Sequence, residues 1–128
     1  MKLMKKARRF ERKILGQIKK SGKYGKVVEQ VTLTLKDGTR ARFDGIGKKG
    51  GNLYELIEAK MGKGKLSKNQ KKVLEALNNG DDIIPVGKNA EQIFGKDAIG
   101  KSITKELSKD VNLNGSVQSA AKVIKDRR

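Results

Sequence analysis

The chain of 128 residues contains no cysteine and no histidine. Without cysteine it has no disulfide framework, no thiolate nucleophile and no cysteine-ligated zinc. Without histidine it has no imidazole-dependent triad, no histidine-metal nuclease or zinc hydrolase site, and no ribonuclease site with a histidine base. Any catalysis must therefore rely on carboxylates, lysines, hydroxyl groups or a hard metal ion.

Aromatic residues and long apolar runs are also scarce. The chain has three Phe, two Tyr and no Trp, so recognition of single strands by base stacking is not indicated. No stretch approaches the roughly 18 apolar residues that a membrane span needs. The basic N-terminal segment continues as charged sequence rather than as the apolar part of a secretion signal. We therefore expect no membrane span and no signal peptide.

Positive charge is the component in excess. The chain carries 31 Lys and Arg against 14 Asp and Glu, a net charge of +17. Such a balance predicts a polyanionic partner, which can be nucleic acid, an acidic membrane face or an acidic protein. At this length a single domain is expected over residues 1–128. Within it, the patterns below predict a core over 1–87 and a helical extension over 88–128.

Hydrophobic periodicity in the first part of the chain predicts a helix followed by three strands. Apolar residues at spacings of three and four predict a helix over 1–20 that packs on a sheet, with an amphipathic helix at a membrane surface as the alternative. The turn Asp37-Gly38 has the signature of a tight hairpin. Glycines and lysines over 45–51 predict a flexible loop. The expected strands cover residues 27–35, 39–46 and 53–60.

A second helix and a fourth strand follow. Ser67 and Gln70 have the spacing of a capping box, and Asn78-Asn79-Gly80 ends the helix. Residues 82–86 predict a short strand, which Pro85 places at a sheet edge or a strand end. Beyond residue 88 the apolar spacing predicts helices over 90–94 and 97–107, and a last helix that includes 117–124.

Two acids and a lysine are predicted to meet on the second and third strands. A period of two places Glu58 and Lys60 on one face, and an antiparallel neighbour brings Asp44 beside them. Two carboxylates suit Mg²⁺ or Mn²⁺, while a lysine can orient or deprotonate water and stabilise developing negative charge. A chain with this many lysines also contains Glu-x-Lys triplets by chance. Glu11-Arg12-Lys13 is such a triplet. The strand context is what favours the second triplet.

The order helix-strand-strand-strand-helix-strand, with these residues at these places, resembles the core of the PD-(D/E)XK nuclease superfamily. Residues 42–46, 54–60 and 66–70 are also similar to nuclease domains at the C-terminal ends of bacterial polymorphic toxins, including effectors of contact-dependent growth inhibition. Phe43 stands where the family name expects proline. The resemblance implies an α/β (α+β) fold with a restriction-endonuclease-like αβββαβ core, in which helices flank a central mixed sheet, followed by C-terminal helices.

Functional residues carried over from the resemblance lie in the same stretch. It implies that Asp44 and Glu58 ligate Mg²⁺ or Mn²⁺, with Zn²⁺ less favoured, and that Lys60 activates or orients water. Gln70 would contact the site from its helix, although an ordinary capping role explains it equally well. Glu11 could add an outer carboxylate, but a solvated helix face explains it better.

Partners follow from charge and from the resemblance. The lysines expected to hold phosphates are Lys48, Lys49, Lys63, Lys65, Lys68, Lys71 and Lys72. The resemblance implies a DNA substrate, with tRNA close behind, action in the cytoplasm of a bacterial target cell, and an acidic immunity protein that masks the basic face. Two alternatives stay open: a non-catalytic nucleic-acid-binding protein, ribosome-associated or architectural, and a metal-independent ribonuclease toxin. The oligomeric state is not predicted.

Overall fold

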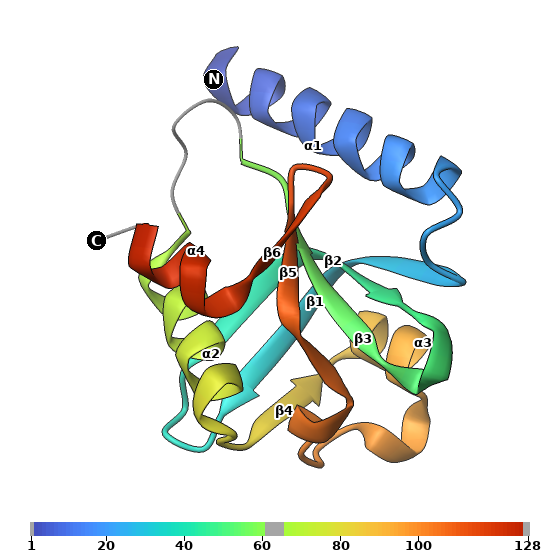
Figure 1. The fold of residues 1–128 in the computed structure, drawn as a ribbon. Coiled ribbons are helices and arrows are strands. Elements are labelled where there is room, and N and C mark those ends of the chain that lie inside the picture. Colours follow the sequence, from blue (N-terminus) through green and yellow to red (C-terminus); the bar gives the residue numbers. More distant parts are fainter. Residues whose placement is uncertain (1, 61–65, 127–128) are drawn as a thin grey trace.

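A computed structural model describes residues 2–60 and 66–126, and the side chains of residues 8–60 and 66–124. Within these residues, six strands form one mixed sheet in the order β4-β1-β2-β3-β5-β6. The strands are β1 (Lys26–Leu35), β2 (Arg40–Lys48), β3 (Tyr54–Glu58), β4 (Ile83–Val86), β5 (Leu107–Leu113) and β6 (Ser116–Ser119). The helices are α1 (Lys2–Lys20), α2 (Lys68–Asn79), α3 (Lys88–Phe94) and α4 (Ala120–Asp126). The protein is thus α+β, with helices flanking a mixed sheet (Figure 1).

Helices cover both faces of the sheet because its central strands are apolar on both faces. Successive residues of a strand point to opposite faces, and the neighbours Leu56 and Ile57 of β3 belong to different hydrophobic clusters. Ile57 packs with Leu15 and Ile18 of α1. Leu56 belongs to the larger cluster, to which α2 and α4 contribute, and α1 crosses the sheet apart from these two helices (Figure 1). The prediction that the first helix packs on a sheet is confirmed.

Element order over the first 87 residues is as predicted. Strands β1 and β2 are antiparallel and joined by the Asp37-Gly38 turn, where Gly38 has φ +92°. Strand β4 pairs with β1 and forms one edge of the sheet, as Pro85 predicts. The capping box of α2 is present, because Ser67 accepts from the Gln70 backbone while the Gln70 side chain accepts from Ser67.

The flexible loop expected over 45–51 is wrong in its first half, where β2 continues to Lys48. Gly45 and Gly47 are strand residues that allow α1 and the segment after it to lie close to the sheet. A Cβ atom on Gly47 would lie 2.5 Å from the Tyr24 ring, and one on Gly45 would lie 3.3 Å from Leu15. The third strand is shorter than predicted and ends at Glu58.

The helix predicted over 97–107 is wrong. Ile99, Ile103 and Leu107 are four residues apart, which imitates a helical stripe. Gly100, however, adopts φ +82°, a left-handed conformation that interrupts a helix. The segment instead forms two 3₁₀ turns, Lys96–Ala98 and Thr104–Glu106.

Residues 88–128 are therefore not a helical extension of a core that ends at 87. Helices α3 and α4 are present, but β5 and β6 lie between them along the chain and belong to the sheet. Strand β5 runs parallel to β3, and Val117, which was expected in the last helix, lies in β6. Among the described residues, no helix is both long enough and apolar enough to cross a membrane.

Candidate functional site

Asp44 of β2 and Glu58 of β3 face each other across two paired strands. The backbone N–H of Asp44 donates to Glu58 Oε1 at 3.0 Å, and the backbone N–H of Ala59 donates to Asp44 Oδ2 at 2.8 Å. This exchange places both carboxyl groups at the end of β3, as the strand register predicted. The sequence motif and the tertiary structure thus bring the same two acids together.

Lys60 completes the predicted group although it lies beyond the end of β3. Its Nζ is 3.0 Å from Glu58 Oε2. Glu58 is only 1% exposed, so the ammonium supplies a counter-charge where water supplies little. About a quarter of the Lys60 side chain is exposed, so this ammonium can also reach a ligand.

Gln70 has both of the roles that the sequence left open, because its amide group is used at both ends. The Oε1 atom accepts from Ser67 N at 2.9 Å, which completes the cap of α2. The Nε2 atom donates to Glu58 Oε2 at 2.8 Å and to the Arg42 carbonyl oxygen at 2.9 Å. Helix α2 is therefore tied to the site through the residue that caps it.

Glu11 does not lie on a solvated helix face. It is half-buried, and its Oε2 accepts from Gln30 Nε2 at 2.6 Å. Its carboxyl group is close enough to Asp44 to raise the pKa of Asp44 by repulsion. Helix α1 thus brings a third acid to the edge of the site.

The strand geometry at Gln30 is irregular. Gln30 has φ +55°, a conformation that costs a non-glycine residue about 1–3 kcal/mol. Val28 and Val31, three residues apart, both belong to the larger hydrophobic cluster, so the alternation of β1 changes phase between them. The pairs Glu29–Gly45 and Val31–Phe43 are in register, and Gln30 and Asp44 lie between these two pairs on their strands. The distortion therefore coincides with the carboxylate site.

Both central acids hold their protons more tightly than usual. Burial raises the pKa of Asp44, and the nearby Glu11 carboxyl raises it further. Burial likewise raises the pKa of Glu58, and the charge of Asp44 adds to this effect. Hydrogen bonds and the Lys60 ammonium oppose the shift without cancelling it. The site therefore favours a bound proton or another cation.

Asn114 is a residue that the sequence analysis missed. Its Oδ1 accepts from Lys60 N at 2.7 Å, and its Nδ2 donates to the Lys60 carbonyl oxygen at 2.9 Å. Its own N–H donates to the Glu58 carbonyl oxygen at 3.0 Å. The dipeptide Asn114-Gly115 is a hairpin signal that could have revealed the β5–β6 turn. The contact of that turn with Lys60 depends on the parallel pairing of β5 with β3.

The lysines expected to hold phosphates are spread apart. Lys49 forms an ion pair with the fully buried Glu55 at 3.1 Å, and Lys48 lies beside it at the end of β2. Lys72 lies near the β1–β2 turn, where hydrogen bonding to Thr39, and to a smaller extent the charge of Lys72, lowers the pKa of Asp37. Lys68 and Lys71 lie in the first turn of α2. Lys63 and Lys65 lie outside the described residues.

The Glu55 end of β3 carries a second polar group, which is structural. Tyr24 donates to Glu55 Oε1 at 2.5 Å and accepts from Asn112 Nδ2 at 3.0 Å. Burial and the Glu55 carboxylate raise the pKa of Tyr24 well above its usual range. The group joins the segment after α1 to β3 and β5.

The donor atoms of Asp44 and Glu58 suit a hard cation. Among the described residues, no group of three or more Asp, Glu, His or Cys side chains has the arrangement of a metal site. Magnesium sites, however, commonly use one or two carboxylates and complete their shell with water and substrate phosphate. Because the pair offers only oxygen atoms, it fits Mg²⁺ or Mn²⁺ better than Zn²⁺.

Comparison of the chain with protein-family models, with curated proteins and with solved structures found no match.

Proposed function

We propose that this protein is a metal-dependent nuclease that hydrolyses phosphodiester bonds. The observation that carries the proposal is the convergence of Asp44, Glu58 and Lys60 at the end of β3. In a chain of net charge +17, a pair of acids of which Glu58 is buried and Asp44 is partly buried repels phosphates unless a cation lies between them. A restriction-endonuclease-like core, as the sequence resemblance implies, would place its catalytic acids on these strands.

Each residue would have a distinct task. Asp44 and Glu58 would hold Mg²⁺ or Mn²⁺, which when bound neutralises phosphate charge and acidifies water. Lys60, as an ammonium, would orient the attacking water and stabilise the negative charge that develops on the phosphate. Gln70 holds the Glu58 carboxylate and Asn114 holds the Lys60 backbone, so both act as positioning residues.

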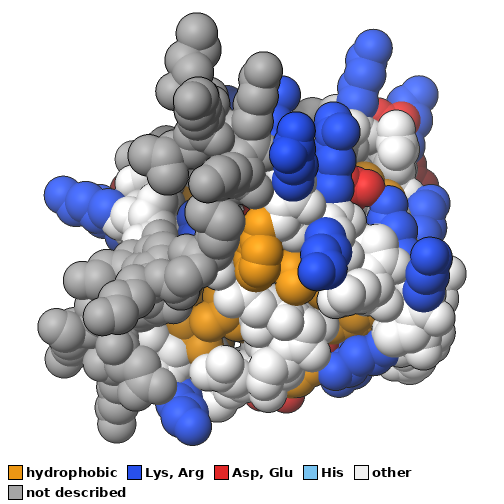
Figure 2. Space-filling view, turned by 90° about the horizontal axis from the view of Figure 1, so that it is seen from above, with side chains coloured by type: hydrophobic (Ala, Val, Ile, Leu, Met, Phe, Trp, Pro, Cys, Tyr) orange, Lys and Arg blue, Asp and Glu red, His pale blue; other side chains and the backbone are white. Residues whose placement is uncertain are grey.

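The biological setting is proposed from the motif resemblance. We infer an antibacterial toxin domain that acts in the cytoplasm of a target cell on DNA, with tRNA as the next candidate. A producing cell would need an inhibitor, and an acidic immunity protein would complement the basic surface. Blue Lys and Arg side chains predominate over red ones among the described side chains on the α1 side of the molecule (Figure 2).

Incubation with plasmid DNA and with total RNA tests the proposal. Cleavage should require Mg²⁺ or Mn²⁺, stop in EDTA, and be lost in Glu58→Ala and Lys60→Ala. Glu75→Ala and Lys105→Ala, which change exposed residues, should cleave as the wild type does. Cleavage that persists in EDTA would favour the metal-independent ribonuclease. Tight, salt-sensitive binding that survives Asp44→Ala, without cleavage of either substrate, would favour the non-catalytic binding protein.

A further inference from the structure

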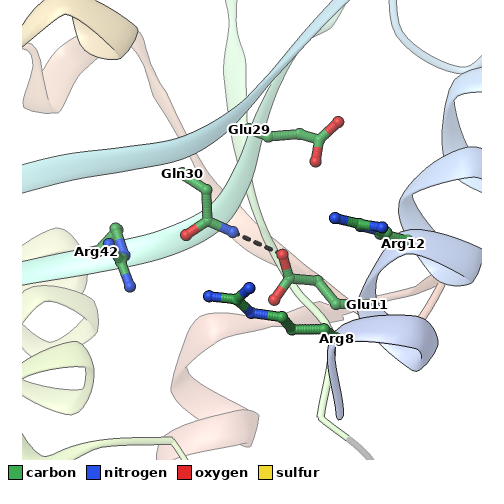
Figure 3. A pocket seen from close by; sticks show the side chains of 6 residues that line it. All are labelled: Arg8, Glu11, Arg12, Glu29, Gln30 and Arg42. Atoms are coloured by element: carbon green, nitrogen blue, oxygen red, sulfur yellow. Dashed lines mark hydrogen bonds between the residues drawn. The ribbon is translucent and has the colours of Figure 1, made fainter. Parts of the chain in front are cut away.

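A polar pocket opens between α1 and strands β1 and β2, beside the carboxylate site. It has a volume of about 330 Å³. Its lining residues are Arg8, Glu11, Arg12, Glu29, Gln30 and Arg42. Arg8 and Arg12 extend from α1 and Arg42 from β2, around the hydrogen bond between Glu11 and Gln30 (Figure 3). Three guanidinium groups therefore surround one hollow.

Each of the two acids of this pocket has a hydrogen-bond partner other than the arginines, and for Glu29 this partner is a cation. Glu11 accepts from Gln30 at 2.6 Å, and Glu29 pairs with Lys19 at 2.5 Å. Among the residues whose side chains are described, none of the three arginines forms an ion pair. The three guanidinium groups outnumber the two carboxylates of the hollow, and one of these, Glu29, is already paired with Lys19. The excess positive charge favours binding of an anion.

A second hollow, of about 280 Å³, continues the first toward the start of α3. Gln30 and Arg42 line both hollows. Lys88 adds a further basic residue, and Asn89 donates to the Gln30 carbonyl oxygen at 3.0 Å. The two hollows together form a path, here called the arginine groove, bordered by Arg8, Arg12, Arg42 and Lys88.

The arginine groove begins at the carboxylate site. Arg42 precedes Asp44 by two residues on β2, and its carbonyl oxygen accepts from the Gln70 amide that also holds Glu58. Glu11 lines the groove and also raises the pKa of Asp44. An extended anion lying in the groove would therefore contact Glu11 and Arg42, the two lining residues that adjoin the carboxylate site.

We propose that the arginine groove binds the phosphate backbone of a nucleic-acid strand on one side of the cleaved bond. Guanidinium groups match phosphate oxygens with two parallel hydrogen bonds, and the elongated shape suits a chain of phosphates. The role of the groove in cleavage rests on the proposed nuclease function, whereas its binding of the strand does not. The groove would bind the strand beside the site in addition to the lysines that the sequence predicts to hold phosphates.

Binding can be measured without cleavage in a Glu58→Gln background. In this background Arg8→Ala, Arg12→Ala and Arg42→Ala should each weaken binding of a short fluorescent oligonucleotide about three- to tenfold and lower the salt slope by about one. The controls are Lys101→Ala and Lys105→Ala, which remove exposed basic side chains that do not line the groove. These variants should change the affinity for the oligonucleotide less than about twofold. Circular dichroism and melting temperature establish that each variant is folded.

The outcomes separate this inference from the proposed function. Equal losses in the arginine and lysine variants, or no loss in the arginine variants, would overturn the groove as a specific site. Polyglutamate that carries the same total charge as the oligonucleotide serves as a competitor. If it displaces the oligonucleotide, and the three arginine variants weaken its binding equally, the groove fits an acidic polypeptide and the inference is wrong. If the wild type cleaves nothing but the arginine variants alone lose binding, the groove stands and the nuclease proposal fails.

Discussion

Gln70 Nε2 lies 2.8 Å from Glu58 Oε2, while Oε1 of the same amide group accepts from Ser67 N at 2.9 Å. One side chain therefore caps α2 and fixes a buried carboxylate of the candidate site. The effect of losing the cap can be separated from the effect of releasing Glu58, because Ser67 takes part only in the cap.

Gln70→Ala and Ser67→Ala form a matched pair of variants. Each should lower the free energy of unfolding by about 0.5–2 kcal/mol, because each removes a capping interaction. Only Gln70→Ala should also lower cleavage, since it releases Glu58. Denaturant unfolding and initial cleavage rates check both effects. Equal cleavage by the two variants would show that Gln70 acts through the cap alone.

Asp44→Asn should stabilise the folded protein at neutral pH while abolishing cleavage. Burial and Glu11 raise the pKa of Asp44, so between the ordinary and the raised pKa the folded state binds more protons than the unfolded state. Stability therefore falls as pH rises through this window. We expect a melting temperature about 2–6 °C higher than that of the wild type at pH 7, with the difference disappearing below the ordinary pKa of Asp.

Mg²⁺ provides an independent check of the same residue. Addition of Mg²⁺ at neutral pH should raise the melting temperature of the wild type, because a cation that binds only the folded state stabilises it. It should leave Asp44→Asn unchanged. An exposed control, Asp97→Asn, should behave as the wild type in both experiments, and an equal response of both variants to Mg²⁺ would contradict a site at Asp44.

Lys60→Met should reduce cleavage at least about 100-fold, which is typical of a lost group that stabilises developing negative charge. It also leaves the Glu58 carboxylate, 1% exposed, without its ammonium partner, so stability at neutral pH should fall by about 1–3 kcal/mol. Because the pKa of Glu58 is raised, protonation near pH 4 should remove this loss. Thermal melts at both pH values, with Lys60→Met/Glu58→Gln as the rescue variant, test the coupling.

Asn114→Gly isolates the side chain that holds the Lys60 backbone. Glycine keeps the left-handed conformation of this position, φ +56° in the structure, so the β5–β6 turn is retained. We expect kcat to fall about tenfold with KM nearly unchanged, because Lys60 is displaced while substrate contacts remain. Ser116→Gly, at an exposed position beside the turn, is the control, and an equal loss there would indicate a general effect on the hairpin.

Gly47→Ala tests the close approach of Tyr24 to β2. The added Cβ would lie 2.5 Å from the Tyr24 ring, which hydrogen bonds to Glu55 and Asn112 keep in place. We expect a loss of about 1–3 kcal/mol in unfolding free energy, as for other overpacked positions. Gly50→Ala meets no atom within 4 Å and should be nearly neutral. Chemical denaturation of both variants measures the difference.

Short-range patterns predicted the elements best. The Asp37-Gly38 turn and the capping box of Ser67 and Gln70 depend on interactions within a few residues, and the structure has both. The edge position of β4 is also as predicted, because Pro85 lacks an N–H group to donate to a second neighbouring strand. The pattern failed over 97–107, where apolar residues four apart coincide with a helical stripe. The spacing of apolar residues along the chain does not indicate which distant strand or helix packs on each of them.

The amino-acid sequence by itself determined the chemistry that is available: carboxylates and lysine without imidazole or thiol, and Asp44 and Glu58 on adjacent strands. Only the tertiary structure decided what surrounds that pair. The crossing of α1 over the sheet brings Glu11, Arg8 and Arg12 to the site. The parallel pairing of β3 with β5 brings Asn114 to Lys60. These contacts join residues far apart in the chain, so packing of the whole fold sets them.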